Sequence, residues 1–170
     1  MRSGFMEINE FEHVLAALMP ANRLACEVSA CTGLRIGDVL NLRSARLCER
    51  FTVRELKTGK TRRVTLPREL LDRLIAQSGK IFVFEGRENY RKPRTRQAVY
   101  KDLARAAKLF RIRGTHISPH SARKIYAVGE YRRTGSITRV KELLNHSDEA
   151  VTMLYAMADE LTQRREKSKK

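Results

Sequence analysis

The chain has 170 residues, of which 42% are hydrophobic, and this is enough for one globular domain with its own buried core. Its 35 Lys and Arg residues against 19 Asp and Glu give a net charge of +16 at pH 7, which indicates a polyanionic partner. No apolar run approaches the length of a membrane span and the N-terminus does not resemble a secretory signal, so we expect a cytosolic protein without a membrane partner.

Helical spacing of apolar residues opens the chain, and a strand-like pattern follows. The spacing predicts helices over residues 8–18, 21–31 and 36–42, with Pro20 separating the first two. Residues 51–56 and 62–66 alternate in polarity, which predicts two β-strands. The residues between them, Lys57-Thr58-Gly59-Lys60, are typical of a hairpin turn, so Lys57 is expected at a strand end.

The second half of the chain is predicted to be mainly helical. Pro67 suits the first position of a helix over 67–77, and the apolar residues 81–84 indicate a short extended segment. Further helices are predicted over residues 97–109, 119–133, 137–144 and 149–157. A charged tail ends the chain.

Residues 86–96 form a polar and basic loop around Pro93 that is well composed for contacts with phosphate groups. A solvated loop without a partner is the alternative. If the loop binds DNA, the contacting side chains are expected to be those of Arg87, Arg91, Lys92, Arg94 and Arg96, with Lys60 added from the hairpin.

The segment from Ser118 to Arg123 has the composition of a helix start. Serine suits the N-cap and Pro119 the first helical position, which places His120 and Arg123 on one face of the first turns. Backbone N–H groups at a helix start favour an anion, so a phosphate would meet an imidazole, a guanidinium and a positive helix end together. For this motif alone, an exposed basic helix start is an equally good interpretation.

Arg35, in the segment from Thr32 to Asp38, supplies a second guanidinium that can hold two phosphate oxygens at once. A surface arginine is the alternative. Asp38 could orient Arg35 or cap the helix, and we favour a structural role. The cysteines Cys26, Cys31 and Cys48 lack metal-ligand spacing and are expected to be buried or incidental thiols.

His146 and Tyr155 complete the set of candidate residues. His146 follows a helix end at Asn145, a residue type that adopts the left-handed conformation used to end helices. A histidine there also suits the helix dipole, without any catalytic role. Tyr155 lies nine residues later, and a core aromatic residue is its ordinary interpretation.

With these residues in this order, the chain resembles the catalytic domain of the tyrosine recombinases, the family of phage integrases and Xer-type resolvases. The resemblance runs from about Leu18 to about Met157. Each motif alone is weak, but six in one order are specific. The resemblance implies an α+β fold, mainly helical with a small antiparallel sheet near one edge. It also implies a catalytic set of Arg35, Lys57, His120, Arg123, His146 and Tyr155.

The reaction implied by the resemblance is attack of Tyr155 on a DNA phosphodiester, giving a 3′-phosphotyrosyl link and strand exchange with no metal or other cofactor. The arginines would stabilise the phosphate and His146 would donate to it. His120 would manage the phenol proton, and Lys57, or less favourably Lys60, would protonate the leaving 5′ oxygen. The implied partners are double-stranded DNA, further copies of the chain, with a tetramer on DNA, and accessory DNA-bending proteins.

Family members usually carry an N-terminal helical domain, and here only about 20 residues precede the matched segment. We therefore expect one catalytic domain over 1–170, with a short charged tail at 158–170 and no core-binding domain, in either an excised fragment or a minimal recombinase. A type IB topoisomerase uses similar chemistry and is one alternative. A non-catalytic DNA-binding regulator that retains the fold is the other.

Overall fold

The computed structural model describes residues 8–112 and 117–145. The expectations for His146, Tyr155 and a helix over 149–157 lie outside these residues. The helices are α1 (Ile8–Ala16), α2 (Pro20–Thr32), α3 (Ile36–Leu40), α4 (Arg68–Gln77), α5 (Arg96–Leu109), α6 (Pro119–Thr134) and α7 (Ile137–Leu144), with a 3₁₀ turn η1 (Ser44–Arg46). The strands β1 (Arg50–Arg54) and β2 (Thr61–Thr65) form the sheet, which confirms the predicted α+β class.

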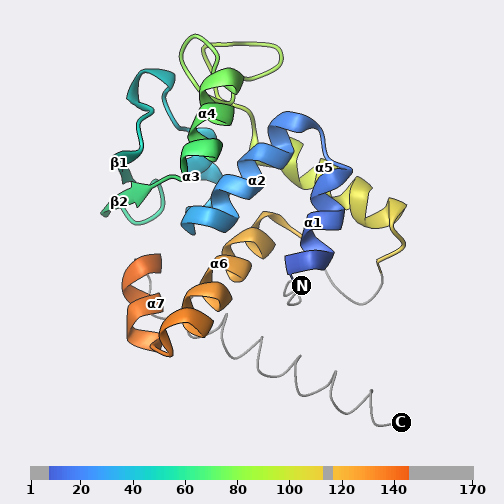
Figure 1. The fold of residues 1–170 in the computed structure, drawn as a ribbon. Coiled ribbons are helices and arrows are strands. Elements are labelled where there is room, and N and C mark those ends of the chain that lie inside the picture. Colours follow the sequence, from blue (N-terminus) through green and yellow to red (C-terminus); the bar gives the residue numbers. More distant parts are fainter. Residues whose placement is uncertain (1–7, 113–116, 146–170) are drawn as a thin grey trace.

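Helix α2 runs through the middle of the fold and packs against α1, α3, α4, α5 and α6 (Figure 1). Its buried face, which includes Leu24 and Val28, joins apolar side chains of α1, α3, α4 and α5 in one core. Helix α7 packs on α6 through a small second cluster of Ala127, Val140 and Leu144. The fold therefore fixes α6 against α2 and the end of α7 against α6. None of the helices in the described residues is long and apolar enough to cross a membrane.

The two strands pair antiparallel at one edge of the molecule, with Phe51 opposite Val64 (Figure 1). The predicted first strand is too long, because β1 ends at Arg54 and the chain turns from Glu55 onward. The turn closes on Glu55, whose N–H donates to the Lys60 carbonyl and whose carbonyl accepts from the Gly59 N–H, both at 2.9 Å. Lys57 therefore lies within the turn and not at a strand end.

The helix ends follow the local sequence closely. Ser118 caps α6 in a capping box with Ser121, as its sequence predicted. Asn145 ends α7 in the left-handed conformation, with φ 54°, which confirms that expectation. Pro67 is the N-cap of α4 and not its first residue. Residues 81–84 form no continuous strand, because Phe82 makes only an isolated bridge to Arg43.

Candidate active site

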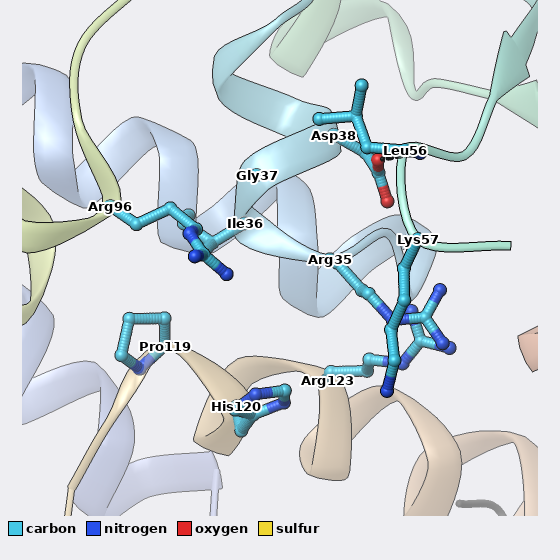
Figure 2. Close-up of a pocket in the computed structure, with 10 residues that line it drawn as sticks. All are labelled: Arg35, Ile36, Gly37, Asp38, Leu56, Lys57, Arg96, Pro119, His120 and Arg123. Atoms are coloured by element: carbon cyan, nitrogen blue, oxygen red, sulfur yellow. Dashed lines mark hydrogen bonds between the residues drawn. The ribbon is translucent and has the colours of Figure 1, made fainter.

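A pocket of about 500 Å³ opens between α3, the β1–β2 turn and the start of α6. It brings together four predicted catalytic residues from three separate segments, Arg35, Lys57, His120 and Arg123, and Arg96 of α5, which was predicted to contact DNA (Figure 2). The remaining lining residues are Ile36, Gly37, Asp38, Leu56 and Pro119. With one carboxylate against three guanidinium groups and a lysine, the pocket is suited to an anion.

Arg35 is the N-cap residue of α3 and has extended backbone angles. Its Nη1 donates to Oε2 of Glu55 at 2.7 Å, and its side chain is 11% exposed. The guanidinium is therefore held at the pocket wall by an ion pair with a fully buried carboxylate. Such pairs are strong hydrogen bonds because both partners are charged and water is largely excluded.

Arg123 is among the most deeply buried side chains of the described residues, at 1% exposure. Its Nη2 donates at 2.8 Å to the carbonyl of Leu144, the last residue of α7. This hydrogen bond joins α6 to the end of α7. Because Asn145 follows Leu144 directly, the same contact fixes the point from which the chain continues toward His146.

His120 and Lys57 differ from Arg35 and Arg123 in their exposure, since both residues are solvent-exposed. The backbone N–H of His120 donates to the Ser118 hydroxyl at 3.3 Å, so the histidine sits in the first turn of α6. Lys57 extends into the pocket from the β1–β2 turn (Figure 2). Lys60 belongs to the same turn but does not line the pocket.

Asp38 joins α3 to the hairpin, as its favoured structural role predicted. Its Oδ1 accepts from the Leu56 N–H at 2.8 Å. Burial raises the pKa of Asp38, and this hydrogen bond from Leu56 opposes the rise. By holding Leu56, Asp38 fixes the residue next to Lys57.

Glu55 belongs to the site but was not predicted from the sequence. Besides Arg35, its carboxylate accepts from the Thr58 hydroxyl at 2.9 Å and lies 3.9 Å from Nη1 of Arg62. A signal was present, because Phe51 and Val53 are the inward-facing positions of β1 and a period of two brings Glu55 to the same face. Burial lowers the pKa of Arg62, and Glu55 is among the groups that oppose this.

The basic residues of the 86–96 loop do not all lie in the same place. Arg87, Lys92 and Arg94 line a second hollow of about 550 Å³, and Arg96 lines the first pocket. Arg94 donates from Nε to Oδ1 of Asn22, so one of its N–H donors is used by a contact within the fold. Arg91 is exposed, with its guanidinium 5.7 Å from the centre of the Tyr90 ring.

The cysteines separate into one buried and two exposed thiols. Cys26 is buried, and burial raises its pKa to about 12, whereas Cys31 and Cys48 are exposed. Within the described residues, no group of three or more His, Cys, Asp or Glu side chains is placed to hold a metal ion.

The sequence matches the phage integrase family over residues 5–161. The chain belongs to the phage integrase family. A relative in this family, the probable integrase/recombinase YoeC of Bacillus subtilis (strain 168), is 30% identical over 139 residues, which are 78% of this chain and 75% of that protein. The integrase of Escherichia phage P2 is 28% identical over 155 residues, 91% of this chain and 43% of that integrase.

Solved structures of integrases share the fold. The lambda integrase catalytic core superimposes with a TM-score of 0.71 at 21% identity, covering 84% of this chain and 91% of that one. A lambda integrase dimer bound to a COC′ core site gives a TM-score of 0.76 at 19% identity, covering 90% of this chain and 59% of that one. Apart from the B. subtilis protein, the curated relatives are covered over 34 to 56% of their length.

Proposed function

We propose that this chain is the catalytic domain of a site-specific tyrosine recombinase that breaks and rejoins DNA through a 3′-phosphotyrosyl intermediate. The observation that carries the proposal is the single pocket lined by Arg35, Lys57, His120 and Arg123. These residues lie far apart in the sequence, and nothing in helix or strand propensity requires them to meet. Membership of the phage integrase family supports the same activity.

In the proposed reaction the phenol oxygen of Tyr155 attacks the scissile phosphorus and the 5′ oxygen leaves. Arg35 and Arg123 hold the non-bridging oxygens and stabilise the extra negative charge of the transition state. Lys57 protonates the leaving 5′ oxygen, while His120 accepts or relays the phenol proton. His146 donates a hydrogen bond to the phosphate. Rejoining reverses these steps with a 5′-hydroxyl from another strand, so the bond energy is conserved.

The proposed substrate is double-stranded DNA, and the active assembly is an oligomer of this chain on DNA, namely a tetramer. Solved relatives include a lambda integrase tetramer bound to a Holliday junction, with a TM-score of 0.68 at 20% identity. The net charge of +16 supports a DNA partner. Accessory DNA-bending proteins are a further proposed partner. The chain is proposed to be a single catalytic domain over 1–170 with a short charged tail at 158–170, and the family match over 5–161 supports this.

Covalent trapping tests the proposal. With a nicked duplex whose cleaved end diffuses away, the wild-type chain is expected to form a protein–DNA adduct. Tyr155→Phe should bind the duplex and form no adduct, because the substitution removes only the nucleophilic oxygen. Arg123→Ala should form the adduct about 100- to 1000-fold more slowly, as when other charge-stabilising donors are removed.

The outcomes separate the candidate functions. An adduct that persists in Tyr155→Phe would assign the nucleophile to another residue. Specific DNA binding without any adduct would favour a non-catalytic regulator. A wild-type chain that relaxes supercoiled DNA without exchanging strands between sites would favour a type IB topoisomerase.

A further inference from the structure

We infer that Glu55 is a positioning residue that fixes the guanidinium of Arg35 for phosphate binding, an inference that rests on the proposed function. Glu55 is 1% exposed, and its Oε2 lies 2.7 Å from Nη1 of Arg35. A carboxylate is seldom buried so completely unless its charge is paired and its oxygens are hydrogen-bonded. Here the pairing partner is an arginine of the anion pocket.

The carboxylate of Glu55 is itself held from several sides. Oε2 also accepts from the Thr58 hydroxyl at 2.9 Å, while Oε1 lies 3.9 Å from Arg62 Nη1 and 3.5 Å from Asn145 Nδ2. Because both oxygens have partners besides Arg35, Glu55 acts as a fixed support and does not simply follow the arginine.

Arg62 is in turn fixed to the end of α2. It donates to the carbonyls of Thr32 and Gly33, and its guanidinium lies 5.8 Å from the centre of the Tyr126 ring. The support for Arg35 therefore runs from the α2 C-terminus through Arg62 and Glu55. Neither Glu55 nor Arg62 lines the pocket.

The chemistry of phosphate transfer explains why such a support matters. A guanidinium is a planar group with five N–H donors, and its bidentate contact with a phosphate depends on the orientation of the plane. An ion pair between one edge of this group and a fixed carboxylate sets that plane. A misplacement of about 1 Å in such a group can cost about 100-fold in rate.

Glu55 also lies where three catalytic segments meet. Arg35 precedes α3, Lys57 follows Glu55 by two residues in the same turn, and Asn145 precedes His146. Asp38 is not the support for Arg35, because its Oδ1 accepts from the Leu56 N–H and its Oδ2 has no hydrogen-bond partner among the described residues. We assign the effect of Glu55 to Arg35 and not to Lys57, since Arg35 makes the direct 2.7 Å contact.

Single-turnover cleavage with Glu55→Gln, at saturating protein, tests the inference. The amide keeps the shape of the side chain and loses the charge. We expect adduct formation to slow by about 10- to 100-fold, with DNA affinity close to that of the wild type. Glu49→Gln is the matched control, because Glu49 is an exposed glutamate at the other end of β1, and its rate should equal that of the wild type.

A double-mutant cycle separates positioning from general support of the fold. If Glu55 acts through Arg35, adding Glu55→Gln to Arg35→Ala should slow the residual cleavage no further. If the double variant is slower than Arg35→Ala by the same factor that Glu55→Gln slows the wild type, the inference is overturned. A Glu55→Gln rate equal to that of the wild type would overturn it as well. A substrate with sulfur at the 5′ bridging position should not rescue Glu55→Gln. Rescue would assign its effect to Lys57 instead.

The stability of each variant is followed by thermal melting. If Glu55→Gln does not fold, Glu55→Asp keeps the charge but withdraws it by one methylene, and the same cycle with Arg35→Ala applies. Normal wild-type adduct formation together with an unchanged Glu55 variant would overturn this inference and leave the proposed function intact. Absence of a wild-type adduct would overturn the proposed function, and the inference with it.

Discussion

At the scale of single residues, Lys57 and Lys60 occupy one turn but differ in their relation to the pocket. Both side chains are exposed, yet only Lys57 is among the residues that line the pocket (Figure 2). The β1–β2 turn therefore presents one of its two lysines to the place where a phosphate would bind. This favours Lys57 over Lys60 for the proposed role of the acid that protonates the leaving oxygen.

The role of Lys57 can be tested by changing the leaving group. An alkoxide leaves poorly without a proton, whereas a thiolate leaves unaided near neutral pH, because a simple thiol has a pKa of only about 8.5. Lys57→Ala should therefore cleave ordinary DNA slowly and cleave DNA with a 5′ bridging sulfur at close to the wild-type rate. Single-turnover rates on the two substrates measure the effect.

Two variants serve as controls for this prediction. Lys60→Ala should resemble the wild type on both substrates, and Arg123→Ala should stay slow on both, because its defect lies in charge stabilisation. Rescue of Lys60→Ala in place of Lys57→Ala would transfer the acid role to Lys60. If sulfur rescues neither lysine variant, the hairpin does not supply the proton.

At the scale of elements, the end of α2 shows how a local backbone requirement supports the site. Gly33 ends the helix with φ 68°, and a Cβ built there would lie 2.3 Å from the Tyr126 ring. Arg62, which supports Glu55, binds the Gly33 carbonyl and lies over the same ring. A side chain at this position would therefore disturb both the helix end and the packing of Tyr126 of α6 against it.

Gly33→Ala should destabilise the domain more than Gly135→Ala does. Gly135 ends α6 with a similar φ of 65°, but nothing lies within 4 Å of its Cβ position. Gly135→Ala should thus cost only left-handed backbone strain, about 1–2 kcal/mol. Gly33→Ala adds a clash with an aromatic ring, about 1–3 kcal/mol more by analogy with overpacked cores. Equal losses in denaturant unfolding would mean that the Tyr126 ring moves aside without cost.

At the scale of the whole molecule, the charge of +16 should dominate DNA affinity. The logarithm of the association constant should fall linearly with the logarithm of salt concentration, by about 0.9 per phosphate neutralised. Charge reversal at Arg91 and Lys92, both exposed, should reduce this slope if the 86–96 loop contacts the DNA backbone. Fluorescence anisotropy titrations at several salt concentrations measure the slope for the wild type and the variant.

Arg94 provides an internal comparison for the loop. Since its guanidinium binds Asn22, Arg94→Gln should lower stability and leave the slope unchanged, whereas Arg91→Gln should reduce the slope by about 0.9 if Arg91 contacts a phosphate. An equal reduction would place Arg94 at the DNA as well. A slope that stays unchanged in the double reversal would remove Arg91 and Lys92 from the interface.

The sequence by itself determined the local features of this protein. Helix periodicity, the Ser118 cap, the left-handed Asn145 and the basic charge depend on neighbouring residues or on composition, and each is visible in the chain. The order of six residues was specific enough to indicate a family, and the match over residues 5–161 confirms that family; the six are Arg35, Lys57, His120, Arg123, His146 and Tyr155. The roles of those residues remain predictions.

Only the tertiary structure decided which side chains meet. Glu55 pairs with Arg35, 20 positions away, and approaches Asn145, 90 positions away, and no local pattern encodes such distances. Asp38 makes a contact of the same kind, because its Oδ1 accepts from the N–H of Leu56, 18 positions away. The physical reason is burial. A carboxylate shielded from water needs positively charged or hydrogen-bonding partners, and the packing of the elements decides which side chains lie close enough to be those partners.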